Sequence, residues 1–223
     1  MFVVIEGIDG SGKGTVTREL HKLLEQAGHK VESISFPAYE KTLCGKLVGR
    51  YLDGEFGEGS HPYLFGSLWA LDRFERKPYL EAALQFNDVV VSDRYIPSQL
   101  CYSAMTVGVE ERSEVVDHFV KLEYGLLELP VPDVIIFLDV PVKFAVQNIA
   151  KKAKRSYTDK SADKYEADVS YLNKVRSFYV SGLMNHHPPT SFQTVKCERN
   201  GHLISIEKVV EKVRTIVFEM LKG

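Results

Sequence analysis

Features that would assign this chain to a special class of protein are scarce or absent among its 223 residues. Its cysteines, Cys44, Cys101 and Cys197, lie far apart, which argues against a disulfide scaffold and excludes a C-x-x-C metal or redox motif. The N-terminus lacks the basic start of a secretory signal, and the apolar run at 134–138 is far shorter than the ~18 residues of a membrane span. A formal net charge of -2 provides no global basic field. We therefore expect a cytoplasmic protein that binds neither nucleic acid nor membrane.

What the chain does contain is the composition of a folded domain, with 44% hydrophobic, 26% charged and 11% aromatic residues. At this length one core can grow without splitting, so we expect a single domain over residues 1–223. Short apolar runs alternate with longer segments of helical spacing, and this alternation is typical of parallel βαβ units. The expected strands are residues 2–5, 31–36, 89–92, 134–139 and 192–195. The sequence thus predicts an α/β fold in which helices flank a parallel sheet.

Two helices and two loops are clear in the pattern. The apolar face from Leu20 to Ala27 predicts a helix after the first strand, and Gly28 supplies its stop. Apolar residues recur with a period of 3.6 between Ile206 and Leu221, which is typical of a core-facing helix. Residues 53–60 are rich in glycine and residues 151–163 are rich in lysine, so both segments are expected to be loops.

The most informative motif follows the first expected strand, where Gly7, Gly12 and Lys13 match most of the phosphate-loop pattern G-x-x-x-x-G-K-[S/T]. The glycines let successive N–H groups point at one anion, and the following helix adds the positive end of its dipole. Lys13 adds a mobile charge for the β- and γ-phosphates. The residues that the motif assigns to a nucleoside triphosphate are Gly7, Gly10, Ser11, Gly12, Lys13, Gly14 and Thr15. Gly14 stands where the pattern has Ser or Thr, so magnesium ligation by Thr15 stays open.

Five short motifs occur in the order found in one known family. They are GIDGSGKGT from Gly7, Phe36-Pro37-Ala38-Tyr39, Ala70-Leu71-Asp72-Arg73, Asp93-Arg94-Tyr95 and Asp163-Lys164-Tyr165-Glu166. Together they resemble the thymidylate kinases, and the bacterial-type members most closely. The resemblance covers nearly the whole chain. It implies a three-layer P-loop kinase fold with a small basic lid at 151–163, ATP-dependent phosphorylation of dTMP to dTDP, ATP and Mg²⁺ as cofactors, and a homodimer.

The resemblance also implies which residues hold the acceptor phosphate and the metal. Tyr39 and Arg94 match residues that bind the phosphate of dTMP, for which a guanidinium fork is well suited. Asp9 matches a carboxylate that contacts the sugar 3′-hydroxyl and, together with Glu166, the magnesium region. Asp93, at the end of the third strand, completes the expected metal set, since carboxylate oxygens suit a hard cation.

Further residues are implied for the base and for catalysis. Trp69 matches an aromatic residue that stacks on thymine, Arg73 one that bonds a pyrimidine carbonyl, and Gln99 one that reads the base. Tyr102 matches a residue that favours deoxyribose, and Phe36 completes the substrate set. The expected catalytic set is Lys13, Asp9, Arg94 and Arg155. Arg155 belongs to it because no basic residue follows Asp9 in the phosphate loop, and relatives of that arrangement supply a cation from the lid.

Several alternatives stay open at this point. Arg94 can instead pair with Asp93, Asp9 can cap its own loop, and Trp69 can be a core residue. The histidines His186, His187 and His202 are expected in exposed turns rather than at a metal. Another nucleotide or nucleoside kinase, a GTPase-like switch and an inactive structural relative are the rival functions. The switch is disfavoured because the Asn-Lys pair at 173–174 is not followed by the x-Asp of a guanine site.

Overall fold

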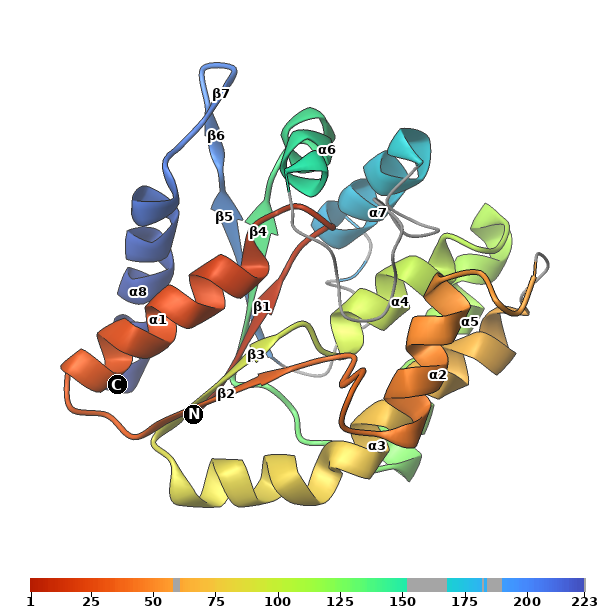
Figure 1. Ribbon diagram of the computed structural model, residues 1–223, viewed down its shortest axis with the longest axis horizontal. Helices are drawn as coiled ribbons and strands as arrows, with labels where there is room; N and C mark the ends of the chain where they lie inside the picture. The colour runs from red at the N-terminus through yellow and green to blue at the C-terminus, as the bar shows by residue number, and fades with distance from the viewer. Residues whose placement is uncertain (58–60, 152–167, 182, 184–189, 223) are drawn as a thin grey trace.

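A computed structural model describes residues 1–57, 61–151, 168–181, 183 and 190–222. Its centre is a five-stranded sheet in which all neighbouring strands are parallel, in the order β2-β3-β1-β4-β5 (Figure 1). The strands are β1 (Phe2–Glu6), β2 (Val31–Ser35), β3 (Val89–Asp93), β4 (Val134–Asp139) and β5 (Ser191–Lys196). Every expected strand is therefore confirmed, with ends that shift by one residue or less.

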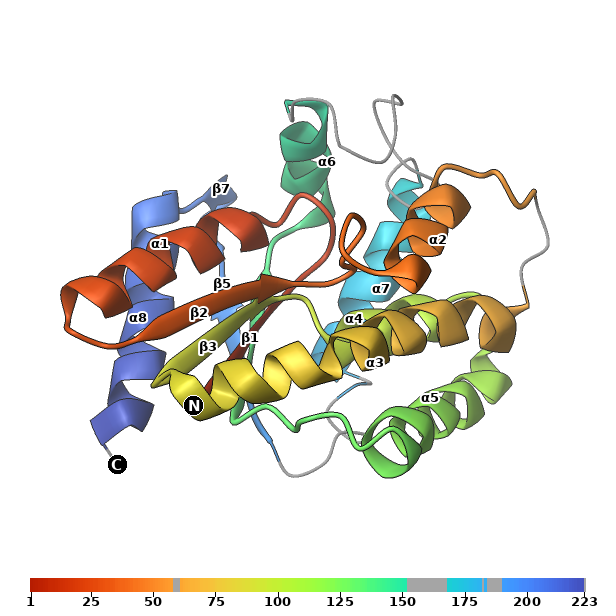
Figure 2. The ribbon, with the colours of Figure 1, turned by 60° about the horizontal axis from the view of Figure 1, so that its bottom comes forward.

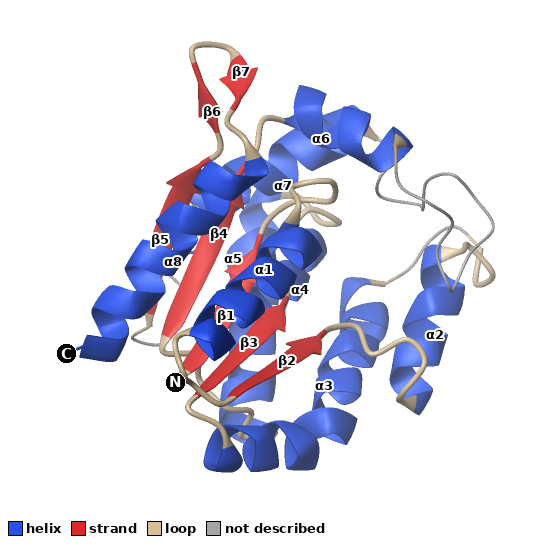
Figure 3. Cartoon of the chain, turned by 60° about the vertical axis from the view of Figure 1, so that its left-hand side comes forward, coloured by secondary structure: helices blue, strands red, loops and turns tan. Residues whose placement is uncertain are grey.

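Helices cover both faces of this sheet. Helices α1 (Lys13–Gln26) and α8 (Ile206–Lys222) pack against each other on one face (Figure 3). The helices on the opposite side and at the ends of the sheet are α2 (Leu43–Leu52), α3 (Pro62–Phe86), α4 (Ile96–Ala104), α5 (Arg112–Val120), α6 (Val142–Ala150) and α7 (Val169–Ser181). This arrangement confirms the three-layer α/β fold.

Shorter elements complete the described part of the chain. A 3₁₀ turn, η1 (Val109–Glu111), precedes α5, and a π-helix, η2 (Lys121–Leu126), follows it. An antiparallel hairpin of β6 (Glu198–Arg199) and β7 (His202–Leu203) extends from the end of β5. The sequence analysis did not predict this hairpin, although the two residues between its strands, Asn200 and Gly201, form the pair typical of a tight hairpin turn and have left-handed φ angles of 53° and 81°. No helix in the described ranges is both long enough and apolar enough to cross a bilayer.

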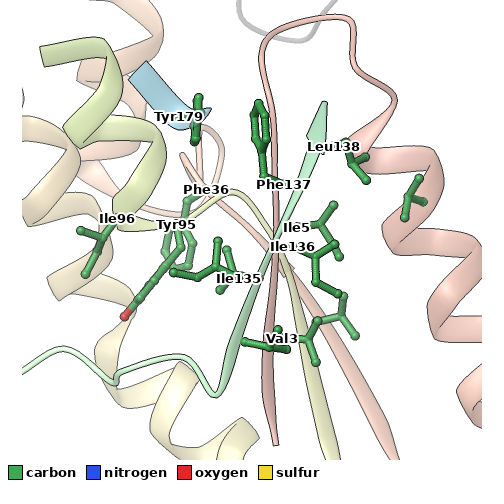
Figure 4. Packing of buried hydrophobic residues seen from close by; sticks show 14 of the residues in the cluster. Val3, Ile5, Phe36, Tyr95, Ile96, Ile135, Ile136, Phe137, Leu138 and Tyr179 are labelled. Atoms are coloured by element: carbon green, nitrogen blue, oxygen red, sulfur yellow. The ribbon is translucent and has the colours of Figure 1, made fainter. Parts of the chain in front are cut away.

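Burial of the central strands explains why the sequence predicted them clearly. Strands β1, β3 and β4 are buried along almost their whole length, whereas the edge strands β2 and β5 are partly exposed. Strands covered on both faces need continuous apolar runs, and the central three supply them. Figure 4 shows one part of this core, where the ring of Tyr179 from α7 stacks on Phe137 from β4 at a centroid distance of 4.7 Å.

Helix α1 ends where the sequence predicted. Gly28 has a left-handed φ of 90°, and its N–H donates to the carbonyl of Glu25 at 2.9 Å. The N–H of His29 donates to the carbonyl of Leu24 at 3.1 Å. These two bonds form a Schellman motif, for which glycine is the favoured residue. The turn sends the chain directly into β2, and it confirms Gly28 as the stop.

Most of the expected lid lies outside the described residues. Lys151 follows α6, and residues 152–163 of the lid lie outside the described residues, as do Asp163, Lys164, Tyr165 and Glu166. The same holds for Arg155, His186 and His187. Residues 53–57 of the expected glycine-rich loop are confirmed as a turn after α2.

Candidate active site

The phosphate loop joins β1 to α1 and is braced from outside by α6. Gly7, Gly10 and Gly12 have φ angles of 156°, 78° and 88°. A Cβ atom at Gly10 would lie 2.1 Å from the carbonyl oxygen of Ala145, so α6 packs too closely for any side chain there. Asn148 of α6 also donates from Nδ2 to the Gly10 carbonyl at 2.9 Å. The loop is thus held in place by the fold before any ligand binds.

Lys13 lies inside this loop and not at the surface. Its side chain is buried, and Nζ donates to the carbonyls of Gly7 at 3.0 Å and Ile8 at 2.9 Å. Burial, with a smaller contribution from the Arg94 charge, lowers the pKa of Lys13 to about 8. The hydroxyl of Ser11 is buried and has no hydrogen-bond partner among the described residues. A helix N-terminus, an ammonium group and an unused hydroxyl fit the phosphates of ATP.

Arg94 lies on the other side of the loop, at the end of β3. Its Nη2 pairs with Oδ1 of Asp9, and its Nη1 donates to Oγ of Ser98 at 2.9 Å. Tyr102 donates its hydroxyl to the second oxygen of Asp9 at 2.6 Å. In the described ranges Arg94 forms no ion pair with Asp93, so that structural alternative is wrong.

The two cations meet at one backbone oxygen. The carbonyl of Gly7 accepts from Nζ of Lys13 at 3.0 Å and from Nη1 of Arg94 at 3.4 Å. Nζ of Lys13 and Nη1 of Arg94 are therefore both within hydrogen-bond distance of the same atom. A phosphate bound at each cation would place donor and acceptor next to each other.

One pocket collects the expected acceptor residues. Its lining includes Asp9, Phe36, Tyr39, Trp69, Arg73, Arg94, Gln99 and Tyr102. These residues come from the phosphate loop, the segment after β2, α3, the end of β3 and α4. Figure 2 shows α4 running behind α3, and α2 packs against α3. Sequence reasoning missed Tyr51, Phe65 and Ser98, which also line the pocket, because no local motif marks them.

Trp69 packs in an apolar cluster and is also exposed to the pocket, so its expected contact with a base stays a prediction. It is half-buried and packs edge-on against Tyr51 at 5.4 Å, within a small apolar cluster that is separate from the main core. It also lines the pocket. The cluster places Trp69 between helices α2 and α3 and outside the sheet core.

The loop that carries Tyr39 is held by Asp72. This buried carboxylate accepts from the N–H of Ala38 at 3.0 Å and from the hydroxyl of Thr42. Thr42 in turn caps α2 by accepting from the N–H of Gly45 at 2.8 Å. Asp72 and Arg73 are neighbours in sequence, so one short motif of α3 both holds the loop that carries Tyr39 and lines the pocket.

Arg73 forms the floor of the pocket through a buried ion pair. Its Nε and Nη2 lie 2.5 Å and 2.9 Å from the two oxygens of Glu123, a residue of η2. Both side chains are almost completely buried. Nη2 also donates to Oε1 of Gln99, which leaves the Gln99 NH₂ group buried with no partner among the described residues. Glu123 was not predicted, since a single Glu in an apolar segment gives no signal of its partner.

The residues present near Asp93 fit a hard cation. Its Oδ1 is buried and has no hydrogen-bond partner in the described part of the chain. Its Oδ2 lies 3.0 Å from the point where a Cβ on Gly14 would be, so Asp93 faces the start of α1 beside Lys13. An unused carboxylate oxygen beside a phosphate loop suits Mg²⁺. The described residues contain no group of three or more His, Cys, Asp or Glu arranged to hold a metal on their own.

Comparison with known proteins agrees with this geometry. Residues 5–200 match the family model described as thymidylate kinase. The thymidylate kinase of Mycobacterium tuberculosis is 29% identical over 180 residues, which cover 80% of this chain and 84% of that protein. A probable thymidylate kinase of Pyrobaculum aerophilum is 34% identical over 181 residues, covering 81% of each chain. One from Archaeoglobus fulgidus is 28% identical over 222 residues, covering 99% and 96%. The chain belongs to the thymidylate kinase family.

Proposed function

We propose that this protein transfers the γ-phosphoryl group of ATP to dTMP and forms dTDP. The observation that carries the proposal is the carbonyl of Gly7, which Lys13 and Arg94 both contact. One cation belongs to the phosphate loop and the other to the pocket that contains Trp69 and Arg73. The family membership supports the same reaction. We further propose that the enzyme works in the cytoplasm, as one domain over residues 1–223 with a lid at 151–163.

Phosphoryl transfer depends more on positive charges held at fixed positions than on proton transfer. Lys13 and the N–H groups of the loop hold the β- and γ-phosphates of ATP, and Arg94 holds the phosphate of dTMP. The attacking oxygen is already anionic at neutral pH, so no general base is needed. When bound beside Asp93, Mg²⁺ supplies positive charge to the phosphates. Arg155, Asp9 and Glu166 keep their predicted roles as lid cation and metal-site carboxylates, and Arg155 and Glu166 lie outside the described residues.

The pocket floor favours a base with a carbonyl group. Gln99 lines the pocket and turns its own oxygen toward Arg73, which leaves its NH₂ group as a donor with no partner among the described residues. Arg73 also carries only donors. Two donors match the carbonyl oxygens of thymine or uracil and leave the amino group of cytosine or adenine without an acceptor. Mismatched buried polar groups are costly, so the arrangement selects among nucleoside monophosphates.

Coupled-enzyme turnover with ATP and a panel of acceptors tests this proposal. We expect dTMP to be the preferred acceptor and dUMP to be weaker by roughly tenfold in kcat/KM, because it lacks one methyl group. AMP and CMP are expected to be inert. Thymidine is included as the acceptor that a nucleoside kinase would use. Rapid phosphorylation of AMP, CMP or thymidine would contradict the assignment.

The shifted pKa of Lys13 predicts proton uptake when ATP binds. The free protein holds Lys13 at a pKa of about 8, among the charges of Arg94, Asp9, Asp93 and Glu6. Phosphates favour the ammonium form and raise that pKa, so at pH 8.5 binding takes up a proton and ATP affinity falls as pH rises further. Calorimetry at pH 8.5 in two buffers of different ionisation enthalpy measures the uptake. The Lys13→Arg variant is the control, since its guanidinium stays protonated; uptake of the same size in that variant would refute the assignment to Lys13.

We also propose that two copies associate through the outer face of α3. Leu64, Leu71 and Phe74 follow one stripe of this helix and are 65%, 41% and 44% exposed. Trp69 and Arg73 lie on the opposite side of the same helix, in the pocket. A second copy would bury the stripe without blocking the acceptor. Sedimentation equilibrium is expected to give a dimer, and Leu71→Glu a monomer; a monomeric parent protein at micromolar concentration would exclude this interface.

A further inference from the structure

A buried carboxylate lies behind Arg94 and has no role in the chemistry described so far. Glu6 is the last residue of β1, and its side chain is completely buried. Its Oε1 accepts from the backbone N–H groups of Tyr95 at 2.9 Å and Ser98 at 3.2 Å. Its Oε2 accepts from the hydroxyls of Ser98 at 2.7 Å and Tyr179 at 2.9 Å. Four donors therefore converge on one carboxylate at the start of α4.

The backbone of Arg94 needs such support. Its φ of 68° is left-handed, a region that residues other than glycine seldom occupy. On one side its N–H donates to the carbonyl of Ile5 at 3.0 Å. On the other side the next N–H, that of Tyr95, donates to Glu6. The last two residues of β1 thus hold both ends of the turn that directs Arg94 into the pocket.

Glu6 also fixes the side chain of Arg94 through Ser98. A serine hydroxyl has one hydrogen, and here the Ser98 hydroxyl donates it to Oε2 of Glu6. The lone pairs of Ser98 are then available to Nη1 of Arg94, which donates to them at 2.9 Å. Nη2 is held separately by Asp9. A glutamine at position 6 would place an NH₂ donor in reach of Ser98 and would reverse the polarity of this contact.

A helix outside the phosphate loop joins the same network. The Tyr179 hydroxyl comes from α7, the helix after the expected lid, and it lies 3.1 Å from Oγ of Ser98 as well as 2.9 Å from Glu6. Its ring is anchored on Phe137 of β4. Burial raises the pKa of Glu6, and the charge of Arg94 opposes that shift, so the carboxylate and the guanidinium stabilise each other.

We propose that Glu6 is a positioning residue of the acceptor site, which holds Arg94 aimed at the acceptor phosphate through Tyr95 and Ser98, with Tyr179 completing the carboxylate's partners. The inference rests on the proposed function, because it takes Arg94 to bind the phosphate of dTMP. It assigns Glu6 no contact with the nucleotide. Its effect must therefore appear only for ligands that carry the phosphate.

The test compares dTMP with thymidine, which shares the base and sugar and lacks the phosphate. Calorimetry is expected to show that Glu6→Gln weakens dTMP binding by about tenfold or more and changes thymidine binding by less than about twofold. Asp133→Asn is the matched control, since Asp133 caps the opposite end of β1 by accepting from the N–H of Phe2 at 2.6 Å. That variant is expected to bind both ligands like the parent protein. Equal losses for dTMP and thymidine in Glu6→Gln would overturn the proposal, because they would indicate a loosened pocket.

Two further variants keep the test decisive if Glu6→Gln fails to fold. Tyr179→Phe removes one donor to Glu6 and introduces no new polar group, and it is expected to weaken dTMP binding by about threefold while thymidine binding is unchanged. In an Arg94→Ala background, Tyr179→Phe is expected to have no further effect on dTMP, because the network acts through Arg94. A full additional loss in that background would overturn the proposal.

The same measurements separate this inference from the proposed function. If the parent protein binds dTMP no more tightly than thymidine, the acceptor phosphate site itself is wrong. If the parent protein prefers dTMP and both Glu6→Gln and Tyr179→Phe retain that preference unchanged, only the positioning role is wrong.

Discussion

Replacing Lys13 by alanine is expected to lower kcat by at least ~10²-fold, which is the usual loss when one preorganised contact to the transition state is removed. The ammonium group is already placed before ATP arrives, since Nζ is fixed by the carbonyls of Gly7 and Ile8. Burial keeps water away from it, and a charge in such surroundings acts more strongly than one in water. Steady-state turnover with saturating ATP and dTMP measures the loss directly.

Lys22 provides the matched control for this experiment. It lies on the same helix, α1, but its side chain is 54% exposed and pairs with Glu19 at 3.0 Å. Lys22→Ala is expected to leave kcat within about twofold and stability within about 0.5 kcal/mol, as for most exposed ion pairs. If Lys13→Ala retains the parent kcat, Lys13 has no part in phosphoryl transfer, and the phosphate loop serves binding alone.

The elements that the sequence predicted well are those with local signals. The strand at 134–139 is an apolar run whose two faces are both covered, and Gly28 sits where the chain leaves α1 through a left-handed turn. The phosphate loop is likewise a contiguous motif between a strand and a helix. In each case the residues that decide the structure are neighbours in the chain, so their pattern can be read without knowing the fold.

What the sequence did not predict are partnerships across the fold. Arg94 pairs with Asp9, 85 positions away, and not with the adjacent Asp93. Arg73 pairs with Glu123, 50 positions away. A short motif specifies which side chain is present but not which charge will be brought to it by the sheet topology. The same reason explains why Glu6 gave no signal, although Tyr179 reaches it from 173 positions along the chain.

The buried pair of Arg73 and Glu123 leads to the largest expected loss of stability. Glu123→Ala would leave the Arg73 guanidinium buried without its carboxylate, and breaking such a pair from one side costs about 3–5 kcal/mol in the free energy of unfolding. Urea denaturation is expected to show a lower midpoint with an unchanged slope. Glu128→Ala is the control. The Glu128 side chain is 80% exposed, and its ion pair with Lys77 is long, at 3.9 Å. That change is expected to stay within about 0.5 kcal/mol, and an equally small effect of Glu123→Ala would contradict the buried-pair argument.

Replacing both partners then separates stability from recognition. In a double variant such as Arg73→Met with Glu123→Leu, neither buried charge remains, and apolar replacements of buried ion pairs are often neutral or stabilising. Stability is therefore expected to return close to that of the parent protein. Binding of dTMP is expected to be weaker than in the parent protein. The pocket has lost the guanidinium donors of Arg73, and Gln99 has lost the group that orients its amide. A double variant with both parent stability and parent dTMP affinity would mean that the ion pair serves neither purpose. Recovery of stability alone would mean that this buried ion pair serves ligand binding and adds nothing to stability beyond what an apolar floor provides.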